Sequence, residues 1–143
     1  MGSLDQLIKM MNVALSWEYA AMIQYIQHAS MLTGPEYFAI SGEELRHARD
    51  EFEHAVKLSE KIQHLGGVPT VVVAEVKTSW DNAEMLRQDL QGEINALNSY
   101  RKLTEMAEEL HLYDVGEMLR EIALDEQGHA VDLERALGIQ KAR

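Results

Sequence analysis

The heptapeptide DEFEHAV at residues 50–56 returns as DEQGHAV at residues 125–131, 75 positions further along the chain. A lone glutamate keeps the same offset, because Glu18 recurs as Glu93. In each copy the lone glutamate stands 33 positions before the glutamate of a Glu-x-x-His motif. An internal repeat fixes the architecture before any other feature of a sequence. We therefore expect two related halves that contribute equivalent side chains.

Apolar residues recur at steps of three and four along most of the chain, which is the period of an amphipathic helix. Four long helices are predicted, at about residues 4–32, 35–65, 81–110 and 114–137. Helix-stopping residues follow three of them: Gly34 and Pro35, Gly66 and Gly67, and Gly138. Capping pairs are predicted at three helix starts: Thr33 with Glu36, Asp81 with Glu84, and Asp114 with Glu117.

Residues 68–80 break the helical pattern with Pro69 and the β-branched run 70–73. The segment is too short and too isolated to found a sheet. It is longer than the ~2–8 residues of ordinary helix connections, so it can travel the length of a bundle. We expect an extended crossover whose valines pack along the outside. The prediction is an all-α, antiparallel four-helix bundle with one long crossover between the second and third helices, in a single domain over residues 1–143.

Composition narrows the classes of function. The chain has 143 residues and a formal net charge of −11, which favours cations and disfavours nucleic acid and anionic membranes as partners. It has no cysteine, which excludes disulfides, thiolate zinc sites and iron–sulfur clusters. Residues 1–11 lack the apolar region of a secretion signal, and no apolar run approaches the ~20 residues of a membrane span. We expect a cytoplasmic protein.

The repeated residues form a candidate metal site. Each Glu-x-x-His pair lies on one face of its helix, and each lone glutamate has apolar neighbours, so all six side chains are predicted to face the interior. Four carboxylates in a core repel one another and lose their hydration, and both effects cost free energy. Two divalent cations would neutralise the four negative charges and so remove this cost. The candidate metal-binding and catalytic residues are Glu18, Glu51, His54, Glu93, Glu126 and His129. Such ligands suit iron or manganese, with zinc as a substitute.

Several other histidines and tyrosines can be explained without a role at the metal site. We assign His47, His64 and His111 to solvated helix faces. Tyr25 and Tyr100 each follow a lone glutamate by seven residues, so they share its helical face. Their hydroxyls either donate to metal-bound carboxylates or simply pack in the core.

The set Glu18, Glu51-x-x-His54, Glu93 and Glu126-x-x-His129 resembles the di-iron signature of the ferritin-like superfamily, and most closely that of the bacterioferritins. The resemblance implies a ferroxidase centre that binds two iron ions and oxidises Fe(II) with O2 or H2O2 for iron storage or detoxification. Of the carboxylates, we expect Glu51 and Glu126 to bridge or flank the ions and Glu18 and Glu93 to be terminal. Asp50 corresponds to an accessory iron ligand of that family and is either a transit ligand or a solvated residue.

Two departures from the bacterioferritin pattern carry expectations. The haem-ligating methionine is replaced by Phe52, so haem is not expected. Five residues follow Gly138, too few for the short fifth helix that helps to close the bacterioferritin cage. We expect a homo-oligomer, at least a dimer.

Other functions can use the same ligands. One alternative is a rubrerythrin-like peroxidase, although Ala96 and Leu97 stand where rubrerythrins carry an extra glutamate. A di-iron oxidase or oxygenase acting on an organic substrate is another, and it requires a pocket beside the metals. The third is a helical module that binds metal only for structure.

Overall fold

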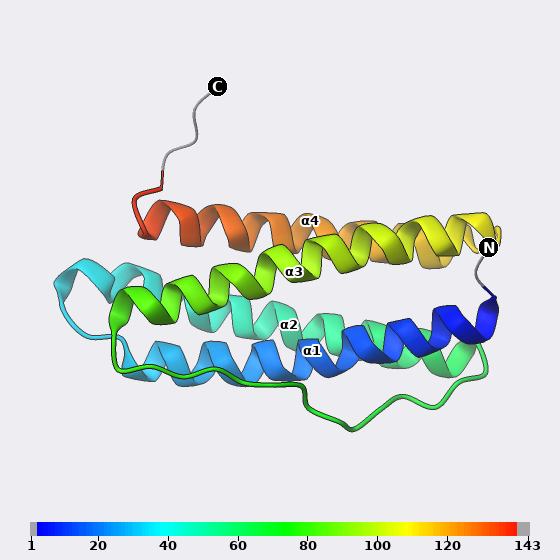
Figure 1. Cartoon of the computed structure of the whole chain (residues 1–143), viewed down its shortest axis with the longest axis horizontal. Helices are drawn as coiled ribbons and strands as arrows, with labels where there is room; N and C mark the ends of the chain where they lie inside the picture. Colours follow the sequence, from blue (N-terminus) through cyan, green and yellow to red (C-terminus); the bar gives the residue numbers. More distant parts are fainter. Residues whose placement is uncertain (1–2, 140–143) are drawn as a thin grey trace.

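The computed structural model describes residues 3–139, and within that range it contains helices and no strand. The elements are α1 (Leu4–Met31), the short 3-10 helix η1 (Pro35–Tyr37), α2 (Phe38–His64), α3 (Asn82–Glu109) and α4 (Tyr113–Ala136). Figure 1 shows α1 and α2 as one antiparallel pair, α3 and α4 as a second pair, and a long segment that runs back along the bundle between α2 and α3. The predicted four-helix bundle with one long crossover is confirmed. No described helix is long and apolar enough to span a bilayer.

Side chains of α1 hold the crossover in place through hydrogen bonds. Asn12 binds the backbone of Val68 and Thr70 at 3.0 and 2.8 Å, and Gln24 accepts from the Lys77 amide at 2.8 Å. An isolated extended segment has no ladder of its own, so its backbone groups need such partners. The expected packing of the valines was wrong, because Val71 is 90% exposed and Val68, Val72 and Val73 also face outward.

The helix ends test the capping predictions. Asp81 caps α3 as expected, with its carboxylate accepting from the Glu84 amide at 2.8 Å. Gly66 follows α2 with φ of +94°, a conformation that a residue with a Cβ atom rarely adopts. The pair Thr33 and Glu36 forms no capping box, because the Thr33 backbone pairs with the side chain of Asn82 instead.

The cap predicted at Asp114 is also wrong. The helix α4 begins at Tyr113, and its N-cap residue Leu112 makes no side-chain bond. Asp114 instead accepts from Lys61 of α2 at 3.0 Å. An ion pair between two helices has displaced the local cap.

Apolar residues form two separate clusters along the bundle. The larger one contains Leu7, Leu58, Leu103 and Leu119 among others, and the smaller one contains Tyr25, Ile40, Leu86, Leu90 and Leu133 among others. Every helix contributes to both clusters, and in every helix the predicted site residues lie between the two contributions. The apolar ends therefore hold a polar layer in the middle of the bundle.

Candidate metal centre

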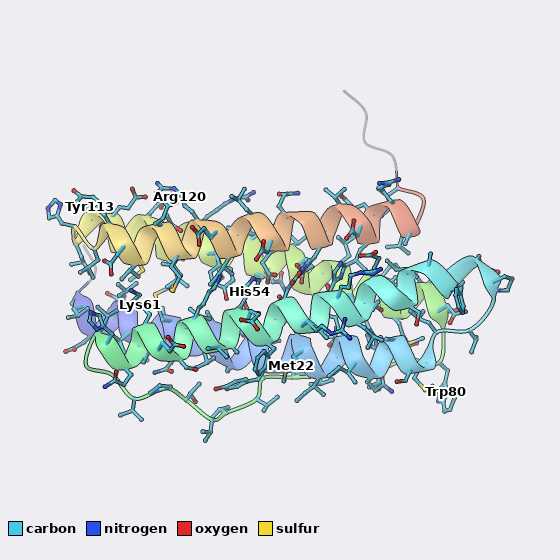
Figure 2. The ribbon with its side chains drawn as sticks, turned by 180° about the vertical axis from the view of Figure 1, so that it is seen from behind. Met22, His54, Lys61, Trp80, Tyr113 and Arg120 are labelled. Atoms are coloured by element: carbon cyan, nitrogen blue, oxygen red, sulfur yellow. The ribbon has the colours of Figure 1, made fainter. Side chains whose placement is uncertain are left out.

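The six repeated residues all lie in this middle layer. They are almost fully buried, since none of the six residues is more than 4% exposed. Figure 2 shows His54 at mid-length of the bundle, between α2 and α4. Glutamate and histidine are seldom buried without partners. Their burial therefore marks this layer as a site that packing alone does not explain.

The side chains fall into two groups that share two members. Each group offers four ligand atoms that lie within 4.8 Å of one another. The groups are Glu18, Glu51, His54 and Glu126, and Glu51, Glu93, Glu126 and His129. Glu51 and Glu126 belong to both groups, whereas each lone glutamate and each histidine belongs to one. The twofold character of the sequence repeat is thus preserved in the geometry.

The histidine rings face the carboxylates through their Nδ1 atoms. Nδ1 of His54 lies 3.0 Å from Glu51 Oε1 and 3.5 Å from Glu18 Oε2. Nδ1 of His129 lies 3.2 Å from Glu126 Oε1 and 3.3 Å from a carboxylate oxygen of Glu93. Each ring is therefore nearest to the glutamate of its own Glu-x-x-His motif and to the lone glutamate of the same half.

Two aspartates orient these rings from outside. Nε2 of His54 lies 2.8 Å from Asp125, and Nε2 of His129 lies 2.8 Å from Asp50. An Nε2 proton donated outward leaves the Nδ1 lone pair directed at the centre, as in histidines that bind metals. Sequence reasoning missed this role, although each aspartate directly precedes the glutamate of a repeated motif. About half of each aspartate side chain is exposed, so both reach solvent.

The tyrosines connect the two halves. The Tyr25 hydroxyl donates to Glu93 at 3.1 Å, and the Tyr100 hydroxyl donates to Glu18. Each tyrosine thus serves the lone glutamate of the other half. Burial, followed by the neighbouring carboxylate, raises the pKa of both tyrosines well above the usual range, so both remain donors. Of the two roles considered for Tyr25 and Tyr100, the structure has the hydrogen-bonded one.

Many polar atoms at the centre have no hydrogen-bond partner. They are Oε1 of Glu18, both carboxylate oxygens of Glu51, Oε2 of Glu93, Oε1 of Glu126, and Nδ1 of His54 and His129. Even the 3.0 Å approach of His54 to Glu51 lacks the angles of a hydrogen bond. A buried polar atom without a partner costs about 1–3 kcal/mol. Cations coordinated by these atoms would remove that cost, and two divalent ions would neutralise the four carboxylates. The donor set therefore fits a pair of metal ions.

The same crowding changes proton affinities in the metal-free protein. Burial, followed by the charge of Glu126, raises the pKa of Glu18 to about 7 and that of Glu93 to about 8. Burial lowers the pKa of both histidines, but the adjacent carboxylates outweigh it and raise the pKa of His54 to about 9 and that of His129 to about 11. The metal-free site therefore holds protons near neutral pH, and binding of cations would release them.

His47 was wrongly assigned to a solvated face. It is 2% exposed, its ring stacks on that of His129 with 4.1 Å between centroids, and its Nε2 lies 3.1 Å from Asp132. His47 precedes His54 by seven residues and so lies on the same face of α2, which is the signal that could have found it. The other two histidines, His64 and His111, are exposed as expected.

A cavity of about 390 Å³ lies beside the centre. Its lining includes Glu18 and Glu93 of the centre and the apolar side chains of Val13, Trp17 and Ala96. The pocket required by the organic-substrate alternative is therefore present.

Comparison with known proteins gives consistent matches over nearly the whole chain. The family model for a ferritin-like domain matches residues 8–141. A bacterioferritin from Brucella melitensis is 30% identical over 135 residues, covering 94% of this chain and 84% of that protein. A bacterioferritin from Streptomyces coelicolor is 25% identical, covering 94% and 81%. The crystal structure of a ferritin-like, diiron-carboxylate protein from Bacillus anthracis superposes with a TM-score of 0.91 at 33% identity, covering 96% of this chain and 99% of that one.

Proposed function

This chain belongs to the ferritin-like family, and on that premise we propose that its buried centre is a ferroxidase site that oxidises Fe(II) with O2 or H2O2. The resemblance noted in the sequence is confirmed at the level of the family. The observation that carries the proposal is the set of buried, unpartnered oxygen and nitrogen atoms that converge in the middle layer. A diiron-carboxylate protein of the same fold supports iron as the metal.

We assign the six residues as ligands of two iron ions. Glu51 and Glu126 belong to both ligand groups, which supports a bridging role. Glu18 with His54, and Glu93 with His129, would complete one ion each. Manganese or zinc would be a substitute for iron, because carboxylate and imidazole ligands accept all three.

The protein's own contribution is electrostatic and positional. Two Fe(II) ions supply two electrons, which together with two protons would reduce O2 to H2O2, or H2O2 to two molecules of water. The four carboxylates stabilise the additional positive charge of the oxidised ions. Tyr25 and Tyr100 fix the orientation of the terminal glutamates, and Asp50 and Asp125 fix that of the histidine rings. The apolar clusters separate the centre from the two ends of the bundle.

Aerobic addition of Fe(II) to the metal-free protein tests the proposal. Rapid oxidation of two Fe(II) per chain is expected. Absorbance changes and oxygen consumption measure it. Glu51→Ala and Glu126→Ala should abolish the fast phase, because each change removes a ligand common to both groups. Glu60→Ala, an exposed residue of the same helix as Glu51, is the matched control. Binding of two ions without faster oxidation than in buffer would refute the ferroxidase proposal and favour a structural metal site.

The cavity beside the centre supports a second candidate, an oxidase or oxygenase acting on an apolar organic substrate. Ala96→Leu would narrow the cavity without changing a proposed ligand. A ferroxidase should keep its rate of Fe(II) oxidation in this variant, whereas an enzyme that uses the cavity for its substrate should lose turnover. A peroxidase of the rubrerythrin kind would consume H2O2 repeatedly when supplied with a reductant.

The remaining expectations are part of the same proposal. We treat residues 1–143 as one ferritin-like domain without haem, acting in the cytoplasm as a homo-oligomer. Phe52, at the position of the bacterioferritin haem ligand, has no sulfur to offer, so purified protein should show no Soret band. Size-exclusion chromatography distinguishes a dimer from a cage. Of the five residues that follow Gly138, residues 140–143 lie outside the described residues.

A further inference from the structure

A second cluster of buried ionisable residues lies apart from the six proposed iron ligands. It consists of His28 on α1, Glu44 on α2 and Asp89 on α3. Their side chains are 0–3% exposed, and each offers a ligand atom within 4.8 Å of the other two. One imidazole and two carboxylates are a ligand set that divalent transition metals accept.

The hydrogen bonds of His28 prepare its ring for a cation. Nε2 of His28 lies 2.9 Å from the Lys77 carbonyl oxygen, which can only accept, so Nε2 carries a proton. The other ring nitrogen, Nδ1, lies 2.9 Å from the carboxylate of Asp89, so a proton between them makes a hydrogen bond in the metal-free protein. A metal-bound histidine donates its second ring N–H to a carbonyl or carboxylate, and Nε2 of His28 already has such a partner. A cation would therefore take the place of the proton between Nδ1 and Asp89.

Glu44 supplies an independent observation. It is completely buried, and no N–H or O–H group of the described residues donates to either of its carboxylate oxygens. Burial, followed by the charge of Asp89, raises the pKa of Glu44 to about 11, so this side chain carries no charge unless a cation is present. A divalent ion would neutralise both carboxylates and replace the proton by which Glu44 otherwise bonds to Asp89.

The sequence repeat shows that packing does not require this cluster. At the offset of 75 residues, His28 corresponds to Leu103, Glu44 corresponds to Leu119, and Asp89 corresponds to Ala14. Those three residues belong to the larger apolar cluster at the other end of the bundle. The equivalent volume is thus filled by ordinary hydrophobic packing in one half, and hydrophobic replacement of buried charges usually maintains or raises stability.

We propose that His28, Glu44 and Asp89 form a third cation site, distinct from the paired centre, that binds a divalent transition metal ion. The cavity beside the centre gives an ion access to it, because Asp89 and Gln24 line the same cavity as Glu18 and Glu93. Gln24 also donates to Asp89 at 2.9 Å and holds that carboxylate in position. In an iron-loaded protein the ion would be Fe(II).

Equilibrium dialysis of the metal-free protein against Co2+ without oxygen tests the third site by difference. Glu44→Gln, which keeps the size of the side chain, should bind one ion fewer than the unmodified protein and retain the pair. Glu51→Ala combined with Glu126→Ala should lose two ions and retain the one that depends on Glu44. Glu60→Gln is the control and should bind as the unmodified protein does. Equal stoichiometry in the unmodified protein and Glu44→Gln would overturn the proposal.

Proton NMR of the Co2+-loaded protein gives a readout that does not depend on counting ions. A histidine bound through one nitrogen shows a paramagnetically shifted proton on the other. His28, His54 and His129 should give three such signals, and Glu44→Gln should remove one of them. If the variant is less stable, the signals of the paired centre still report whether it is folded. Retention of all three signals in Glu44→Gln, or only two in the unmodified protein, would contradict a third site. Absence of the two paired signals from the unmodified protein, with the Glu44-dependent signal present, would instead contradict the proposed iron centre.

Discussion

The metal-free protein should lose stability as the pH rises, and Glu18 provides a measure of the effect. Burial of the carboxyl, followed by the charge of Glu126, raises the pKa of Glu18 from the ordinary value of 4.5 to about 7 in the folded chain. Between these values the folded chain keeps a proton that the unfolded chain has released. The contribution of this proton to the free energy of unfolding is therefore fully present below pH 4.5 and is lost as the pH rises to about 7.

The size of the loss follows from the two values. At about 1.4 kcal/mol for each pH unit, the free energy of unfolding should fall by about 3 kcal/mol on account of Glu18 alone. For a chain of this length that corresponds to a decrease of about 6–12 °C in melting temperature. Glu93, with a pKa of about 8, acts in the same direction over a wider window.

Urea denaturation of the chelator-treated protein, followed by circular dichroism between pH 4.5 and 8, measures this loss. The Glu18→Gln variant cannot ionise at this position, so its free energy of unfolding should fall by about 3 kcal/mol less over the same range. Glu60→Gln, at an exposed position, should follow the unmodified protein and so controls for the change in net charge. A constant difference between Glu18→Gln and the unmodified protein across the range would refute the reasoning. Saturating Zn2+ should reverse the trend, because metal binding releases protons and strengthens as the pH rises.

Three further substitutions test individual contacts. Asp125→Asn weakens the acceptor for Nε2 of His54, so the cation affinity measured by calorimetry should fall about 10–100-fold. An unchanged affinity would show that Asp125 does not orient the ring. Tyr100→Phe removes the donor to Glu18, so Fe(II) oxidation in stopped flow should slow while the fold is retained; a rate equal to that of the unmodified protein would reduce the tyrosine to core packing. Gly66→Ala places a Cβ atom at φ of +94° with open space around it, so backbone strain alone should lower stability by about 1–2 kcal/mol, and no loss in thermal melting would contradict that account.

The helices and the middle layer could be predicted because their signals are periodic. Apolar spacing located the four helices to within a few residues, and the repeat identified the buried glutamates and histidines that the structure brings together. Helix caps were less predictable, because a carboxylate such as that of Asp114 can accept either from backbone amides at a helix start or from a lysine on the neighbouring helix, and here it accepts from Lys61. Only the tertiary arrangement decides between two partners of similar strength.

Two buried histidines outside the repeat were missed by sequence reasoning. His47 and His28 correspond to Ile122 and Leu103 in the other half, so no duplication separated them from ordinary surface histidines. Both proved to be buried in the interior. Asp50 and Asp125 were duplicated, yet an acidic residue beside a motif on an acidic chain has little information until its partner across the bundle is known.

The two halves therefore produce a centre that is symmetric in its ligands and asymmetric in its surroundings. At one end Leu103, Leu119 and Ala14 form continuous apolar packing, which stabilises the bundle without any ion. At the other end the equivalent positions hold an imidazole and two carboxylates, which cost free energy unless a cation or protons neutralise them. A pair of ions in the proposed centre would thus be supported rigidly from one side and would adjoin ionisable groups on the other. If the proposed sites bind ions, the polar end is the side on which ions can be exchanged, and the apolar end is the side that keeps the ligand residues in place.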